Sequence, residues 1–317
     1  MNKNHYVAIM AGGIGSRFWP QSRVNRPKQF LDILGTGETL LQSTYKRFAE
    51  IVPKENIYIV TGQRYTNLVK TQLPEIEQTN IIAEPGRKNT APCVAYVAYK
   101  LAAKNSNASF VVAPSDHLIT NDTAFVDNIK QALAFADNNN ELLTLGIKPT
   151  SAHTGYGYIH FDNKDNQNGV YGVQAFTEKP DLDTAKKMVA DGSYLWNAGI
   201  FIWSVKSIVH AFEKYQPAIA QLFEKGNAQY NTPNETNYIE QMYPKCPSIS
   251  IDYAIMEYAK NVRVIPATFG WNDLGSWSSL WEQLPKDAQN NAVLGDKVKL
   301  YEADNCVVST NGDKLMV

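Results

Sequence analysis

Short apolar runs alternate with longer segments of helical periodicity through the first half of the chain. The apolar runs predict strands at residues 7–11, 57–60, 81–82, 109–113 and 141–146. The segments between them predict helices, one opening at the capping box after Thr39 and others at 63–73, 90–104 and 125–136. Strands that alternate with helices favour a mostly parallel sheet with helices on both faces. The expected fold class is therefore α/β, a Rossmann-like three-layer sandwich.

The second half of the chain is more mixed. Strands are predicted at 157–161, 173–177, 195–205 and 262–266, and helices at 207–214, 218–225, 250–259 and 276–284. No linker rich in Gly, Ser or Pro interrupts this pattern. Residues 1–285 are thus expected to form one domain, and residues 286–317 a short β-leaning tail.

Composition and charge narrow the classes of partner. The chain has 317 residues, 44% of them hydrophobic and 19% charged, with a net charge of −1. Nucleic-acid and membrane-surface proteins need a basic face, so neither nucleic acid nor membrane is expected as a partner. The three cysteines show no zinc or disulfide spacing, and neither a signal peptide nor a membrane span is apparent. A reducing, cytoplasmic location is expected.

A glycine-rich loop follows the first predicted strand. Gly12, Gly13 and Gly15 allow backbone N–H groups to approach an anion closely, and Arg17 and Lys28 add positive charge. The dinucleotide pattern G-x-G-x-x-G would need glycine where Phe18 stands, and no Gly-Lys-Ser/Thr of a P-loop occurs. A lone glycine cluster can also be a simple tight turn. With the two cations beside it, this one favours a site for a nucleoside triphosphate or a sugar phosphate.

The segment that contains this loop and three further motifs follow one another in a fixed order. Segments 11–20, 27–30, 176–180 and 196–199 read AGGIGSRFWP, PKQF, FTEKP and WNAG. With these motifs the chain resembles the sugar-phosphate nucleotidyltransferases. The runs EPGRKNTAP at 84–92 and WNDLGSW at 271–277 are similar to those of the mannose-1-phosphate guanylyltransferases among them. The resemblance covers residues 5 to about 285, and it implies that the tail could begin a truncated β-helix element.

The resemblance implies an enzyme that transfers GMP from GTP to mannose 1-phosphate and releases pyrophosphate, with Mg²⁺ as its cofactor. Such a transfer depends on in-line positioning and on positive charge near the phosphates. The expected catalytic residues are Arg17, Lys28, Asp116 and Lys179. The expected nucleotide-binding residues are Gly12, Gly13, Gly15, Arg17, Lys28, Gly86, Asn89 and Thr90. The expected sugar-phosphate-binding residues are Gly155, Glu178, Lys179 and Asn197.

Two carboxylates are expected to hold the metal. Asp116 directly follows an apolar strand, and ligands bind at the carboxyl ends of strands in open α/β sheets. Asp273 is the second carboxylate by resemblance, although from the sequence alone it could equally cap the following helix. His117 is interpreted as structural. Asp252 and Glu257 are interpreted as part of a solvated helix face.

Alternatives remain open at this point. The same reaction could use another sugar 1-phosphate, such as glucose 1-phosphate, or another nucleotide. A nonenzymatic nucleotide-sugar sensor on the same fold is a different class, although Lys28, Asp116 and Lys179 are all present. A nicotinamide-dependent oxidoreductase is disfavoured by the broken dinucleotide pattern. The resemblance implies a possible homodimer. The sequence of a single chain does not identify the residues of its interface.

Overall fold

A large sheet forms the centre of the molecule. The computed structural model describes residues 1–13, 15–295 and 298–310. Within these residues, a nine-stranded sheet has the order β3-β2-β1-β4-β9-β6-β10-β8-β7. Its strands are β1 (His5–Met10), β2 (Ile57–Gly62), β3 (Ile81–Glu84), β4 (Ser109–Pro114), β6 (Leu142–Ile147), β7 (Gly157–Gln167), β8 (Val170–Glu178), β9 (Tyr194–Ser204) and β10 (Val262–Ala267).

The sheet is parallel where strands and helices alternate and antiparallel where they do not. Strands β1 to β4 pair in parallel, as do β6 and β10. Strand β9 runs antiparallel between β4 and β6, and β7 and β8 form an antiparallel hairpin. Asn168 and Gly169 connect this hairpin with φ of 55° and 85°. Two positive φ values are typical of a type I′ turn, and so short a connection permits only antiparallel pairing.

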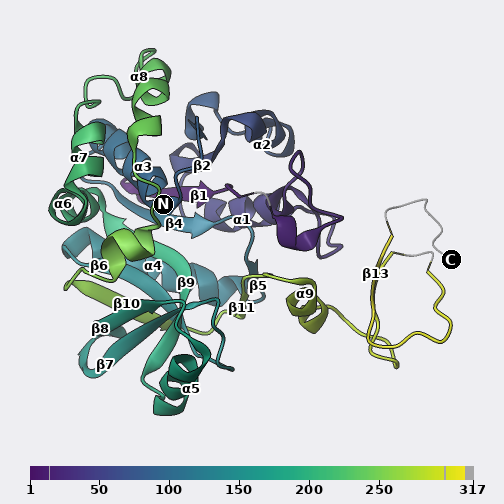
Figure 1. Cartoon of the computed structure of the whole chain (residues 1–317). Helices are drawn as coiled ribbons and strands as arrows, with labels where there is room; N and C mark the ends of the chain where they lie inside the picture. Colours follow the sequence, from purple (N-terminus) through teal and green to yellow (C-terminus); the bar gives the residue numbers. More distant parts are fainter. Residues whose placement is uncertain (14, 296–297, 311–317) are drawn as a thin grey trace.

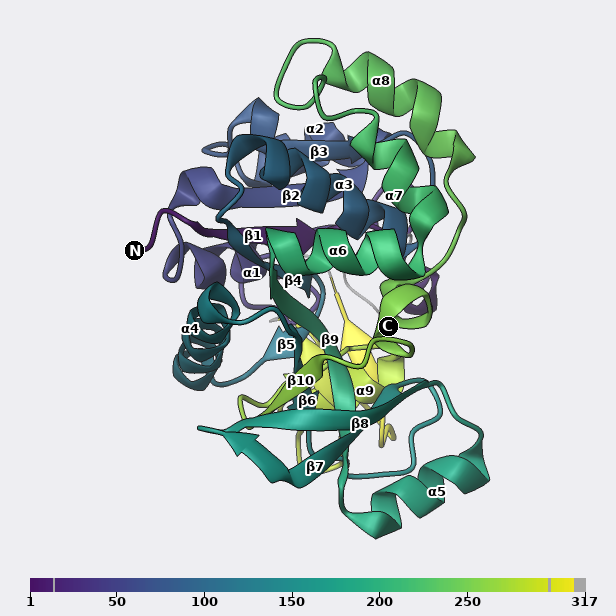
Figure 2. The same cartoon turned by 90° about the vertical axis from the view of Figure 1, so that its left-hand side faces the viewer.

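Helices cover both faces of the sheet, which confirms the predicted three-layer α/β fold (Figures 1 and 2). One apolar cluster includes residues of α3 (Thr90–Lys104), α6 (Val205–Tyr215), α7 (Pro217–Glu224) and α8 (Glu235–Met242). A second cluster includes residues of α1 (Leu40–Ala49), α2 (Thr66–Gln72) and α4 (Asp122–Asn138). Successive side chains of a strand point to opposite faces, so Tyr6 joins the first cluster and Val7 the second.

Several predicted helices are found at their expected places, and one is much shorter than expected. Helix α3 has the bounds expected for it, with the Asn89 side chain accepting a hydrogen bond from the Thr90 N–H. The helix predicted at 250–259 is instead a short π-helical turn at Asp252–Met256. Helices α8 and α5 (Leu182–Asp191) were absent from the prediction. Few of their side chains are buried: Ala185 in α5, and Glu235, Ile239 and Met242 in α8.

Two short strands near the C-terminus lie apart from the main sheet (Figure 1). Strands β12 (Ala292–Leu294) and β13 (Val307–Ser309) pair in parallel. They join α9 (Trp277–Gln283) and the loop around Ile33 in a third apolar cluster. The expected boundary at residue 285 lies between α9 and β12 and stays a prediction. Residues 296–297 and 311–317 of the predicted tail lie outside the described residues.

No helix within the described residues combines the length and the apolar character that crossing a bilayer requires.

A buried ion pair ties α8 to α3. Lys100 Nζ lies 2.7 and 2.6 Å from the two carboxylate oxygens of Glu235, and both side chains are about nine-tenths buried. The Tyr96 hydroxyl and the Asn231 N–H also donate to Glu235, each at 2.7 Å. A buried carboxylate is tolerated when each of its oxygens is hydrogen-bonded in this way.

Replacing Glu235 by alanine is expected to lower the free energy of unfolding by about 3–5 kcal/mol, because Lys100 would be left buried and unpaired. Urea unfolding followed by circular dichroism measures this. Asp183→Ala is the control, because it breaks an exposed ion pair with Lys186 and should cost less than about 1 kcal/mol. Equal stability of the two variants would contradict the prediction.

Candidate active site

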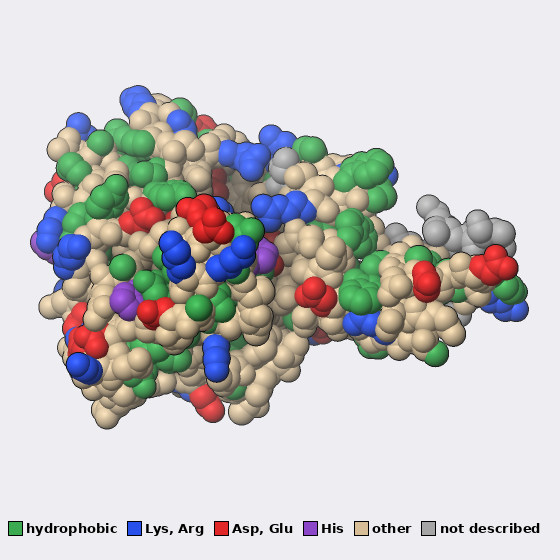
Figure 3. All heavy atoms as spheres, turned by 60° about the horizontal axis from the view of Figure 1, so that its bottom comes forward, with side chains coloured by type: hydrophobic (Ala, Val, Ile, Leu, Met, Phe, Trp, Pro, Cys, Tyr) green, Lys and Arg blue, Asp and Glu red, His purple; other side chains and the backbone are tan. Residues whose placement is uncertain are grey.

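A cleft of about 720 Å³ opens at the carboxyl ends of the parallel strands. Met10, Glu84 and Pro114, the last residues of β1, β3 and β4, line it. Most of the predicted site residues lie there too: Gly12, Gly13, Asn89, Thr90, Asp116, Gly155, Glu178, Asn197 and Asp273. Open α/β sheets bind ligands at this edge. On the face shown in Figure 3, Lys and Arg side chains are interspersed with Asp and Glu.

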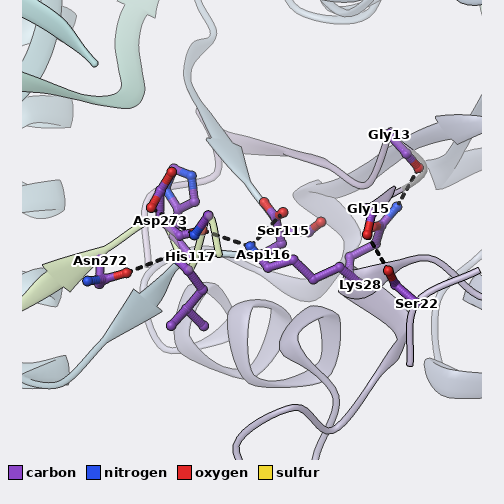
Figure 4. A network of polar contacts seen from close by, with 12 residues as sticks. Gly13, Gly15, Ser22, Lys28, Ser115, Asp116, His117, Asn272 and Asp273 are labelled. Atoms are coloured by element: carbon purple, nitrogen blue, oxygen red, sulfur yellow. Dashed lines mark hydrogen bonds and ion pairs between the residues drawn. The ribbon is translucent and has the colours of Figure 1, made fainter. Parts of the chain in front are cut away.

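Lys28 connects the two aspartates that are predicted to hold the metal, through the carboxylate of Asp116 and the backbone of Asp273. Its Nζ lies 3.1 Å from Asp116 Oδ2 and donates a 2.7 Å hydrogen bond to the backbone oxygen of Asp273 (Figure 4). The lysine is only 5% exposed, and its ammonium lies 5.5 Å from the centre of the Phe18 ring. Lys28 itself is outside the set of residues that line the cleft. It is held beneath that lining by its contacts with the two aspartates.

A small ladder brings the two aspartates together. Strand β5 (Leu118–Ile119) pairs antiparallel with β11 (Trp271–Asn272), so that Asn272 lies opposite Leu118. This pairing sets the residue after β11, Asp273, near the residues that precede β5. Asp116 and Asp273 are far apart in the sequence and meet through this pairing.

Asp273 has a partner other than the following helix. Its Oδ1 accepts hydrogen bonds from the Tyr156 hydroxyl and the Gly275 N–H, each at 2.9 Å. Helix α9 is capped instead by Ser276, whose side chain accepts from the Ser279 N–H in a capping box. The alternative that Asp273 caps this helix is therefore wrong. Tyr156 was not among the predicted site residues, although its neighbour Gly155 was.

The glycine loop is organised by Gln29, which the sequence analysis did not single out. Its Nε2 donates to the carbonyls of Ala11 and Gly12, both at 3.0 Å, and of Gly13 at 3.4 Å. Because a trans peptide points its C=O and N–H in opposite directions, the N–H groups of Gly12 and Gly13 face away from Gln29. Both glycines line the cleft, so these donors are available to an anion.

Two residues of the predicted nucleotide end, Arg17 and Gly86, lie outside the lining of the cleft. Arg17 is exposed and Gly86 half-buried, and neither is among the residues that line the cleft. Arg87 and Lys88, beside Gly86, do line it. Ile14 of the glycine loop lies outside the described residues.

Glu84 is a carboxylate at the predicted nucleotide end and was not among the predicted site residues. It lines the cleft and accepts a hydrogen bond from the Tyr243 hydroxyl. Burial raises the pKa of Glu84 to about 6, against the lowering effect of this hydrogen bond. Its position directly after the apolar residues of β3, in the run that begins EPG, was the signal available in the sequence.

His117 lines the cleft and is held by a neighbour. Its Nδ1 accepts a hydrogen bond from Trp271 Nε1 at 3.0 Å. Burial lowers the pKa of His117, more than the Asp116 charge raises it. The imidazole is therefore neutral near pH 7. The structural role expected for this histidine agrees with its hydrogen bond, and its ring also forms part of the wall of the cleft.

Three acidic residues surround the predicted sugar-phosphate end. Glu178 lines the cleft, and its carboxylate pairs with the half-exposed ammonium of Lys179. Burial disfavours the charged form of Lys179, but the hydrogen bond and the charge of Glu178 outweigh burial and raise the pKa of Lys179. Glu257 Oε1 accepts a 3.0 Å hydrogen bond from the Glu178 N–H. Glu257 is thus a partner of the site and does not belong to a freely solvated face.

Asp252 was also assigned to a solvated helix face, and this interpretation is wrong. Asp252 lines the cleft, and its Oδ1 accepts a 3.0 Å hydrogen bond from Asn197 Nδ2. Burial raises the pKa of Asp252 to about 6, and the nearby charge of Glu178 adds to the shift. The sequence contained no signal for this, because the segment reads as an ordinary amphipathic helix.

The three loop glycines offer a matched series of variants. A Cβ on Gly15 would lie 2.8 Å from both Cβ and the backbone N of Lys28, at a φ of +57°. Gly13 has a φ of +89° with no atom within 4 Å, and Gly12 has neither constraint. We expect Gly12→Ala to be nearly neutral, Gly13→Ala to cost about 1–2 kcal/mol of stability from backbone strain, and Gly15→Ala to cost more.

Thermal unfolding of the three variants measures this order of stability. Among the three, Gly15→Ala should also displace Lys28 from Asp116, because the added methyl group would occupy the space of the lysine backbone. An equal loss in Gly12→Ala and Gly15→Ala would contradict this assignment.

The chain is similar to known proteins over most of its length. The chain is 41% identical over 306 residues to the mannose-1-phosphate guanylyltransferase RfbM of Salmonella typhimurium, covering 95% of this chain and 63% of that protein. It is 37% identical to the xanthan biosynthesis protein XanB of Xanthomonas campestris, covering 92% of this chain and 62% of that protein. The chain therefore spans less than two thirds of the length of these curated relatives.

A solved structure extends the similarity to the whole fold. The crystal structure of a mannose-1-phosphate geranyltransferase from Thermus thermophilus matches with a TM-score of 0.86 and 29% identity, covering 99% of this chain and 94% of that one. The family described as nucleotidyl transferase matches residues 6–290, nearly the full sheet and α9. The chain thus belongs to the nucleotidyl transferase family.

Proposed function

We propose that this chain transfers GMP from GTP to mannose 1-phosphate, giving GDP-mannose and pyrophosphate. A phosphate oxygen of the sugar phosphate attacks the α-phosphorus of GTP, a new P–O bond forms, and the bond to the β-phosphate oxygen breaks. Family membership supports the reaction type, and the names of the relatives support the substrate pair. The observation that carries the proposal is Lys28 lying between Asp116 and Asp273 beside the glycine loop.

The proposed reaction needs charge stabilisation rather than covalent chemistry. The Gly12 and Gly13 N–H groups would bind phosphate oxygens, with Lys28 near the α-phosphate and Arg17 toward the leaving pyrophosphate. Lys179 would bind the phosphate of the sugar, and Glu178 its hydroxyls. Gly15, Gly86, Asn89, Thr90 and Gly155 keep the binding roles predicted for them, and Asn197 acts at the sugar-phosphate end.

We propose Mg²⁺ as the cofactor, held by Asp116 and Asp273. Mg²⁺ binds one or two protein carboxylates together with phosphate oxygens and water. Within the described residues, Lys28 contacts one oxygen of Asp116, and the side-chain hydrogen bonds of Asp273 use Oδ1. Each carboxylate therefore keeps a hard oxygen for the ion. No group of three or more His, Cys, Asp or Glu suited to a metal occurs in the described part of the chain.

When bound, the ion would supply positive charge to the triphosphate. The chain's own groups hold its ligands in place: the Tyr156 hydroxyl fixes one oxygen of Asp273, and Lys28 fixes the backbone at the same residue. A cytoplasmic location and a homodimer belong to the same proposal.

Pyrophosphate release tests the reaction and the substrate together. With GTP and Mg²⁺, we expect the chain to release pyrophosphate with mannose 1-phosphate and to be much slower with glucose 1-phosphate. Fast release with the glucose compound would keep the mechanism and overturn the sugar assignment. GTP binding without release on either sugar phosphate would favour a nucleotide-sugar sensor.

Removing the charge of either aspartate is expected to slow this release. Asp116→Asn and Asp273→Asn should each lower kcat by about 10²–10³ and raise the Mg²⁺ concentration needed for half-maximal rate. Asp127→Asn is the matched control, because Asp127 is exposed on α4, outside the residues that line the cleft. Wild-type Mg²⁺ dependence in both site variants would contradict the metal assignment.

A further inference from the structure

Asp252, Asn197 and Glu178 converge at one end of the cleft from three separate segments. Glu178 is the last residue of β8, Asn197 lies within β9, and Asp252 opens the π-helical turn. Glycine at position 157 makes this convergence possible. A Cβ there would lie 2.5 Å from Glu178 Oε2 and 3.3 Å from Asn197 Cβ. Glu178 and Asn197 therefore both lie against Gly157, in space that the side chain of any other residue would occupy.

The amide of Asn197 is fixed in one orientation. Its Oδ1 accepts a 3.0 Å hydrogen bond from the Gly199 N–H and lies 3.2 Å from the Thr144 hydroxyl, whose single proton is shared with the Ile200 carbonyl at 3.1 Å. Its Nδ2 then faces Asp252 Oδ1 and donates to it at 3.0 Å. Both partners of Oδ1 come from the protein, so Asn197 has little acceptor capacity left for a ligand. Its main effect is to orient the carboxylate of Asp252.

Asp252 has acceptor capacity beyond this contact. A carboxylate offers about four lone-pair positions, and Asn197 uses one of them. The Ser250 hydroxyl and the Lys179 charge also favour its ionised form, yet burial and Glu178 outweigh them and raise its pKa to about 6. Because burial disfavours its charged form, an ionised Asp252 lowers the free energy of unfolding near neutral pH. Groups of this kind are typical of functional sites, where a ligand supplies the missing donors.

We propose that Asp252 accepts hydrogen bonds from ring hydroxyls of the sugar 1-phosphate, and that Asn197 is its positioning residue. Sugar hydroxyls are the donors that two adjacent carboxylates, Asp252 and Glu178, require. Lys179, the next residue in the sequence, forms an ion pair with Glu178 and supplies a cation for the phosphate of the same ligand. The inference rests on the proposed function and assigns the sugar end of that site.

Steady-state kinetics of Asp252→Asn and Asp252→Ala test this role. We expect the KM for mannose 1-phosphate to rise about 10- to 100-fold, as for a lost hydrogen bond to a charged group. The KM for GTP should stay within about threefold, because the nucleotide end is untouched. Tyr253→Phe, at a 43% exposed neighbour, is the matched control and should leave both constants unchanged.

Deoxy analogues identify the contact directly. The wild type should use at least one monodeoxymannose 1-phosphate less efficiently than mannose 1-phosphate, and this difference should disappear in Asp252→Ala. For the positioning role, Asn197→Ala should raise the same KM, and its effect should not add to that of Asp252→Ala. Full additivity, or an unchanged deoxy penalty in Asp252→Ala, would overturn the assignment.

A purely structural role predicts a different result. Asp252→Asn should then lower the melting temperature, whereas we expect an equal or higher value at a pH above the raised pKa of Asp252, because an ionised buried carboxylate is removed. Wild-type activity combined with an unchanged sugar KM in the variants overturns this inference and leaves the proposed function intact. A wild type inactive on every sugar phosphate refutes the proposed function itself.

Discussion

The contact of Lys28 with Asp116 and with the backbone of Asp273 is the interaction on which the site depends. It joins the loop after β1, the end of β4 and the end of β11, which come from widely separated parts of the sequence. A buried ammonium needs compensating acceptors, and here these acceptors belong to the site. Lys28 therefore holds the site together and places positive charge where phosphates would bind.

The sheet determines where the other groups can lie. Parallel strands β1, β3 and β4 end at one edge, so the loops that follow them share one cleft. The antiparallel strand β9 enters between β4 and β6 and carries Asn197 into the same cleft. One edge thus receives the glycine loop and, from the less regular second half of the chain, the acidic residues that are proposed to bind the sugar.

The two ends of the cleft differ in how their charges are balanced. Near the glycine loop, Lys28 offsets Asp116 at 3.1 Å. At the other end, Glu178 and Asp252 share the cation of Lys179, which is partly exposed, and the pKa of Asp252 rises to about 6. A surplus of acceptors suits a ligand rich in hydroxyl donors. This difference in charge balance supports placing the nucleotide and the sugar at opposite ends.

Local sequence patterns were enough to predict the fold class and several of its elements. The strand–helix alternation predicted the sandwich, helix α3 was predicted at its observed bounds, and the glycine loop pointed to an anion site. These features depend on residues close together in the chain. Gln29 behind the loop, Tyr156 on Asp273, and Asp252 beside Asn197 were decided by the tertiary structure. Each of these depends on which distant segments pack together, and the periodicity of one segment contains no information about its partners.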